Sequence, residues 1–164
     1  CHIELLAGDP IAAEAYARRS YEWLRSSGDL AHSSTAAGDL AITSLALGRT
    51  EEARRFAAEC RETSASDDMV NQFIWRAVEA RLLADEGRLV EALDLIREAA
   101  RWAGQTDMLR EQTEIALEEA DICRMAGRMD DARSALRRGR DAAERKGATV
   151  LVERADRRLA ELGP

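Results

Sequence analysis

The sequence predicts an all-α fold: an α-α superhelix (solenoid) of about 3.5–4 helix pairs, followed by a C-terminal capping helix. The first observation behind this fold class is a composition rich in helix formers, with 31 alanines, two prolines and only 4% aromatic residues in 164. The second is a short glycine-centred phrase that recurs four times with spacings of 40, 39 and 40 residues. The third is a set of small residues that recur at fixed offsets from those glycines. A fixed period of this size indicates stacked supersecondary units.

The four phrases predict helix–turn–helix hinges. They are "LAGDPIAAEA", "ALGRTEEARR", "DEGRLVEALD" and "MAGRMDDARS", centred on Gly8, Gly48, Gly87 and Gly127. Glycine adopts the left-handed conformation that closes a helix without a Cβ clash. Proline and acidic residues then suit the positive end of the next helix, as in Asp9-Pro10, Glu51-Glu52 and Asp130-Asp131.

The predicted helices follow from these hinges in order. A helix ends before each glycine and another starts after it, while Gly28, Gly104 and Gly147 are expected to end helices between hinges. The final segment places Leu151, Ala155, Leu159 and Leu162 on one face, as a cap between the last repeat and water requires. The expected helices are the tail 1–7, then 10–26, 30–47, 50–63, 67–86, 89–103, 107–126 and 129–146, and the cap 149–162.

Small residues predict close approach of the paired helices. Five residues after the glycines lie Ala13, Ala53, Ala92 and Ala132; twelve after lie Ser20, Cys60, Ala99 and Gly139; seven before lie Cys1, Ala41, Ala80 and Ala120. Larger side chains at these offsets would hold the helix axes apart. Ala17, Ala57, Ile96 and Leu136, nine after, are expected to fill the core. Trp23 and Trp102 are expected to wedge against the next unit.

This pattern of small residues, glycine, alanine and a large apolar residue resembles the tetratricopeptide repeat. The period of about 40 residues exceeds the family's usual 34, and the family's repeat-closing proline is absent. Longer repeats of this kind resemble the C-terminal regions of large bacterial multidomain regulators, such as transcriptional activators and cyclases. The resemblance implies one helical-repeat domain over 1–164, with units at about 1–27, 30–65, 67–105 and 107–147 and the cap at 149–162. The first residues look like the end of a helix, so we expect a C-terminal fragment of a longer protein.

The resemblance implies a concave groove lined by the first helix of each pair. Carried over by the family's register, the candidate groove residues are Thr35, Asp39, Ile42, Ile74, Val78, Arg81, Asp85, Leu117, Glu118, Asp121 and Arg124. Apolar and charged side chains together suit an extended or helical peptide. The favoured function is a protein–protein interaction or scaffold module that docks a protein or peptide partner, possibly upstream domains of the same chain. Two alternatives stay open: a sensor that binds a small ligand in the concave face, and a homo-oligomerisation module in which the chain forms a homodimer.

Other kinds of chemistry lack sequence support. There are two histidines and three widely spaced cysteines, with no Cys-x-x-Cys pair and no glycine-rich phosphate loop, so no metal site, cofactor or enzyme activity is expected. A net charge of −7 argues against nucleic acid, and the arginines of 133–140 are expected to form a solvated helix face. No apolar run approaches the roughly 20 residues needed to cross a bilayer. Odd, dispersed cysteines favour the cytoplasm, with Cys60 and Cys123 as small buried groups.

Overall fold

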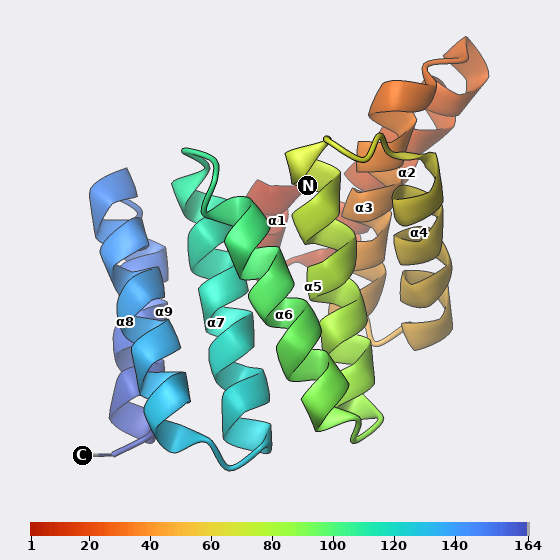
Figure 1. Ribbon diagram of the computed structural model, residues 1–164. Helices are drawn as coiled ribbons and strands as arrows, with labels where there is room; N and C mark the ends of the chain where they lie inside the picture. Colours follow the sequence, from red (N-terminus) through yellow and green to blue (C-terminus); the bar gives the residue numbers. More distant parts are fainter. Residues whose placement is uncertain (164) are drawn as a thin grey trace. The chain divides into compact units, whose positions relative to one another are not determined.

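The chain is all-helical. The computed structural model describes residues 1–163, apart from the side chains of residues 30 and 31. Within the described residues there are nine α-helices and no strand, and helices adjacent in sequence pack together as expected for an α-helical solenoid (Figure 1). The helices are α1 (His2–Leu6), α2 (Pro10–Ser27), α3 (Leu30–Ala46), α4 (Thr50–Thr63), α5 (Met69–Asp85), α6 (Leu89–Ala103), α7 (Leu109–Met125), α8 (Met129–Lys146) and α9 (Thr149–Glu161).

The helix boundaries keep a constant phase to the four glycines. Helices α3, α5 and α7 each have 17 residues and end two residues before Gly48, Gly87 and Gly127. Helix α1 ends at the same offset from Gly8, so its five residues correspond to the last five of α3. Every predicted helix is confirmed to within two residues at its ends, because both boundaries are set by local turn chemistry.

The glycine hinges adopt the predicted left-handed conformation. The φ angles are +81°, +71°, +80° and +71° at Gly8, Gly48, Gly87 and Gly127. Gly28 and Gly147 also end their helices in this conformation. Gly104 does not: its φ is −65°, and the chain leaves α6 through a right-handed turn. Gly104 is nevertheless the C-cap of α6, so the prediction that it ends this helix is confirmed.

An arginine occupies the N-cap position of three of the four second helices and caps nothing with its own side chain. Arg49, Arg88 and Arg128 instead form ion pairs with the acid three residues later, in the first helical turn. The acid sits where the positive end of the helix favours it and also neutralises the arginine. In the phrase Gly-Arg-x-x-acid, the arginine therefore pairs with the acid of the first helical turn. The sequence analysis assigned a role only to the acids.

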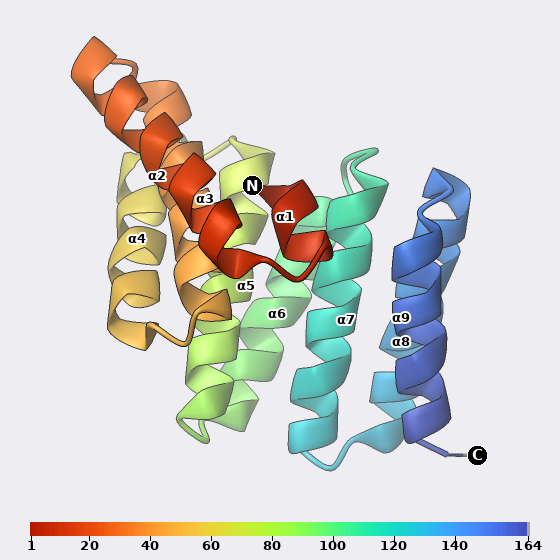
Figure 2. The same cartoon turned by 180° about the vertical axis from the view of Figure 1, so that it is seen from behind.

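The helices form two compact units, Cys1–Glu79 and Ala80–Pro164, and α5 runs through the boundary. In the first unit α2 packs on α3 and α3 on α4, with α1 against α2 (Figure 2). In the second unit α6 packs on α7, α7 on α8, and α8 on α9. Each unit has its own core of alanine and aliphatic side chains.

The small-residue positions are confirmed as packing positions. The alanines five residues after the glycines are fully buried in all four repeats, and the residues nine after are buried as well. Leu151 and Ala155 of α9 are buried while its charged face is exposed, as a cap requires. Two expectations are wrong. Ser20 is exposed, and Trp23 is 66% exposed, so neither side chain is packed as expected.

No helix in residues 1–163 combines the length and apolar character needed to cross a bilayer.

Candidate interaction site

The eleven predicted groove residues divide between the two units. Five lie in the first unit, on α3 and the first part of α5, and six lie in the second, on the end of α5 and on α7. Within each unit they occupy first helices of the pairs, as the resemblance implies. A groove that runs through all the repeats stays a prediction.

Three of these residues are core residues. Ile74, Val78 and Leu117 are all buried, so they offer little surface to a partner. The reason is clearest at Ile74, whose Cγ2 lies 2.7 Å from the position that a Cβ on Gly38 would take. The missing side chain of Gly38 lets α5 pack directly against α3, and Ile74 fills the space. The structure thus places these three predicted groove residues in the core.

Four of the five charged groove residues of the second unit, all but Arg124, take part in ion pairs. Arg81 donates from Nε to Asp85 at 2.9 Å and from Nη1 to Glu118 on α7 at 3.1 Å. One helical turn along α7, Asp121 pairs with Arg158 of α9 at 2.9 Å, and Arg158 also donates to the Leu117 carbonyl at 3.0 Å. We call Arg81, Asp85, Glu118, Asp121 and Arg158 the charged row; its members come from α5, α7 and α9.

Glu118 of α7 is the charged-row carboxyl that faces Arg81 of α5. Burial raises the pKa of its carboxyl, and the facing Arg81 guanidinium partly opposes this shift. Arg81 therefore favours the ionised form of Glu118 against the effect of burial.

Arg158 completes the charged row and was missed by the sequence analysis. The glycine register ends at Gly127, so no repeat position assigned a groove-facing role to a residue of α9. The apolar residues spaced four apart in that helix predict which side packs on the last repeat. They do not predict which arginine of the helix contacts α7.

Arg124 stands apart from the charged row. It is exposed, and nothing in the described residues joins it to the row. In the first unit, Thr35, Asp39 and Ile42 are half-buried on α3. Asp39 faces the N-terminal helix, where His2 Nε2 lies 3.1 Å from its Oδ1.

His2 and Asp39 belong to a small cluster with a cysteine. The potential ligand atoms of Cys1, His2 and Asp39 lie within 4.8 Å of one another. Cysteine, histidine and aspartate are ligands that Zn²⁺ accepts, so these three are the residues that could hold a metal ion among those described. The sequence spacing did not suggest this grouping, because Asp39 reaches it only through the packing of α1 near α3.

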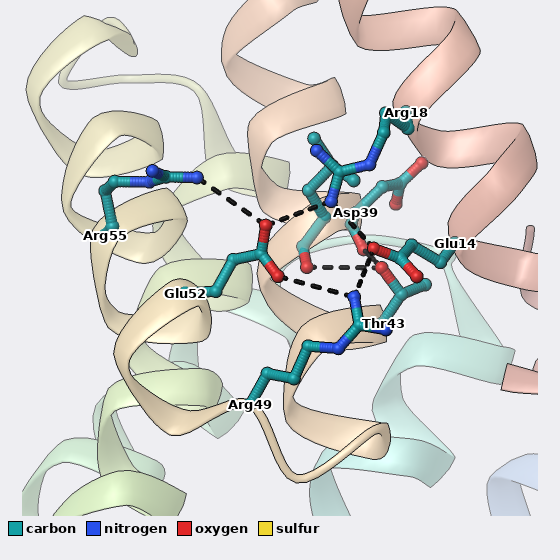
Figure 3. Close-up of polar contacts among 8 residues, drawn as sticks. Glu14, Arg18, Asp39, Thr43, Arg49, Glu52 and Arg55 are labelled. Carbon is teal, nitrogen blue, oxygen red and sulfur yellow. Dashed lines mark hydrogen bonds and ion pairs between the residues drawn. The ribbon is translucent and has the colours of Figure 1, made fainter. Parts of the chain in front are cut away.

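A second set of charges joins the second helices α2 and α4 (Figure 3). Arg18 donates to Glu14 at 2.7 Å and to Glu52 at 2.9 Å, and Arg49 donates to Glu14 at 2.7 Å. The Arg18 hydrogen bond lowers the pKa of the Glu52 carboxyl. In the second unit Arg97 approaches Asp131 at 3.5 Å, and both occupy the repeat positions of Arg18 and Glu52. These ion pairs connect the second helices of neighbouring repeats.

The arginine-rich segment 133–140 is largely neutralised by the protein itself. Arg138 pairs with Glu119 at 2.6 Å, and Arg140 pairs with Asp156 at 2.6 Å. Arg133 donates to the carbonyls of Leu162 and Gly163 at the end of α9. The segment is therefore a solvated and partly paired helix face that holds the cap.

The buried cysteines are poor nucleophiles. Burial raises the pKa of the Cys60 thiol to about 12, and burial also raises the pKa of Cys123. Because the thiolate is the reactive form, both groups are inert at neutral pH.

A small cavity lies among α6, α7 and α8. Its volume is about 140 Å³, and its lining includes alanines, Gln112 and the Glu119–Arg138 pair. Pockets for small ligands usually measure about 300–1,000 Å³, so this cavity is too small for such a ligand.

Comparison with known proteins adds no relative: the chain matches no family model and no curated protein sequence.

Proposed function

We propose that this chain is a tetratricopeptide-like interaction module, the C-terminal regulatory arm of a larger cytoplasmic protein, which binds a protein or peptide partner. The observation that carries the proposal is the charged row. Its five side chains come from α5, α7 and α9; Asp85 is exposed and the other four are half-buried.

The chemistry of the charged row suits a peptide with both signs of charge. Each arginine already makes charge-assisted hydrogen bonds to carboxylates, and a peptide carboxylate can replace one of these acceptors without leaving a buried charge unpaired. Asp85 and Asp121 then become available to a basic side chain of the same peptide. Because the peptide's charges replace ion pairs that the protein already makes, binding depends on the spacing of charges along the peptide. The affinity gained by such an exchange is modest.

The test is a selection of binders from a displayed library of random peptides, followed by affinity measurement on the purified chain. Peptides that dock on this face should lose at least about tenfold in affinity, roughly 1.4 kcal/mol, when Arg81 and Arg158 are both changed to Gln. Glutamine removes the charge and keeps a polar side chain without placing another acid beside Glu118. Circular dichroism melts confirm that the double variant stays folded.

The matched control changes Arg101 and Arg137 to Gln, which removes the same charge from exposed positions on the second helices. This control should leave affinity unchanged within about twofold, since distant surface charges act mainly through a screened long-range field. Equal losses in both double variants would mean that net charge, not the charged row, drives binding. An undiminished affinity in the Arg81 and Arg158 variant would place the binding surface elsewhere.

A further inference from the structure

Three side chains that can bind a metal ion meet where the start of α1 approaches α3. The thiol sulfur of Cys1, an imidazole nitrogen of His2 and a carboxylate oxygen of Asp39 lie within 4.8 Å of one another. His2 Nε2 is 3.1 Å from Asp39 Oδ1. Cys1 and His2 are consecutive, whereas Asp39 belongs to a different helix, so the grouping exists only in the folded chain.

The Cys1 side chain faces this cluster and not the solvent. It is 3% exposed, whereas the side chains of His2 and Asp39 are 31% and 27% exposed. Within the part of the chain that the structure describes, the thiol forms no disulfide and no hydrogen bond reaches its Sγ. A buried sulfur that faces an imidazole and a carboxylate differs from Cys60, which packs in the core as a small hydrophobic group.

The aspartate comes from a firmly packed helix. Its neighbours Gly38 and Leu40 are buried in the core of the first unit. The Asp39 carbonyl oxygen also accepts a hydrogen bond from Thr43 Oγ1 at 3.0 Å. A ligand on such a helix is held in place before the metal arrives, which lowers the conformational cost of binding.

The spacing of the three atoms suits a tetrahedral Zn²⁺ ion. Zinc binds thiolate at about 2.3 Å and imidazole or carboxylate at about 2.0–2.2 Å, so its ligand atoms lie about 3.4–3.6 Å apart. The 3.1 Å between His2 and Asp39 is close to this separation. The sulfur reaches it with a shift of about 1 Å at most. Sulfur and nitrogen ligands favour zinc over calcium or magnesium, which prefer oxygen.

We propose that Cys1, His2 and Asp39 form a Zn²⁺ site that fastens α1 to α3, with a water molecule in the fourth position. Helix α1 has five residues and buries none of them, so packing alone holds it weakly. A metal ion bound by both segments adds the cross-link that packing does not supply. The site uses side chains only, and it does not involve the charged row.

Competition with a chromophoric zinc chelator at neutral pH tests the site. Every protein carries Gly-Ser before Cys1, so that no terminal amine adjoins the thiol. The otherwise unaltered chain should bind a single Zn²⁺ ion. Asp39→Asn and His2→Gln should each weaken binding at least about tenfold, since even the loss of a residue that only supports a ligand costs about 10–100-fold. With Co²⁺ as the probe, Cys1→Ser should abolish the thiolate-to-cobalt charge-transfer band.

The chain offers matched controls for both ligands. His32 Nδ1 lies 2.8 Å from Asp29 Oδ2, which makes a second histidine–aspartate pair without a thiol. His32→Gln should therefore leave the zinc affinity unchanged within about twofold. Asp94→Asn removes the same charge as Asp39→Asn from an exposed position and should be equally neutral. Circular dichroism melts show that each variant is folded.

Hydrogen exchange gives a second measurement that does not depend on the chelator. Zinc should slow amide exchange of residues 2–8 several-fold in the unaltered chain, because the metal holds α1 against α3. The same addition should leave exchange in Asp39→Asn unchanged.

Two results would overturn the proposal. Zinc binding by Asp39→Asn that is as tight as in the unaltered chain would show that adjacent Cys1 and His2 chelate the ion without the fold. Absence of saturable binding at about 1 mM zinc would show that the three side chains form no metal site.

Discussion

Gly38 controls how closely α3 and α5 approach, and Gly38→Ala measures the cost of separating them. The added Cβ would lie 2.7 Å from Ile74 Cγ2 and 3.3 Å from Cys60 Sγ, both inside normal contact distance. Alanine gains about 1 kcal/mol over glycine in helix propensity. Overpacking a well-filled core costs about 1–3 kcal/mol. The net expectation is a loss of about 1 kcal/mol in the free energy of unfolding.

The cause of the loss is separable by a double-mutant cycle. Ile74→Ala alone should cost about 2–5 kcal/mol, because it leaves a cavity beside Gly38. In that background the methyl group of Gly38→Ala enters vacated space, so the substitution should become stabilising by up to about 1 kcal/mol. The sign of the Gly38→Ala effect therefore reverses between the two backgrounds.

Urea unfolding followed by circular dichroism gives the four free energies of the cycle. Val78→Ala, one turn further along α5, is the matched background, and there Gly38→Ala should remain destabilising because the clash with Ile74 persists. A Gly38→Ala substitution that is equally destabilising in the wild-type and Ile74→Ala backgrounds would refute the view that Ile74 fills the space above the glycine.

Three further predictions concern other parts of the chain. Ala92→Leu should lower the free energy of unfolding by about 1–3 kcal/mol, whereas Leu at the exposed Ala15 should change it by less than about 0.5 kcal/mol, and similar urea midpoints would contradict the packing role. With Cys1→Ser, native Cys60 should resist a thiol reagent at pH 8 and react in urea, since its pKa is about 12; fast native labelling would show that the thiol is accessible. Arg18→Met should cost less than about 1 kcal/mol at pH 7, because the pair is partly exposed. The pKa of Glu52 is lowered below 4.5 by Arg18, so this stabilisation is present above pH 4.5 and is lost as the pH falls through the folded-state value; a cost independent of pH would exclude the ion pair as its source.

The candidate site was only partly predictable from the sequence. The register of the glycines placed Arg81, Asp85, Glu118 and Asp121 on first helices. The structure joins the first three through ion pairs and pairs Asp121 with Arg158. The register could not show that Ile74 would be drawn inward, since that depends on the absent side chain of Gly38 on another helix. It also stopped before α9, and so it missed Arg158.

The sequence by itself determined the helices, their hinges and the buried small positions. These features are local: a left-handed glycine, an acidic first turn and an alanine at a fixed offset act within a few residues of chain. The tertiary structure alone decided which charges meet across helices and which faces stay uncovered. Those outcomes depend on side chains far apart in sequence: Ser20 of α2 is exposed, whereas Cys60 and Ala99 at the same repeat offset are buried. Burial is a property of the neighbour that covers a side chain, so no pattern within α2 could reveal it.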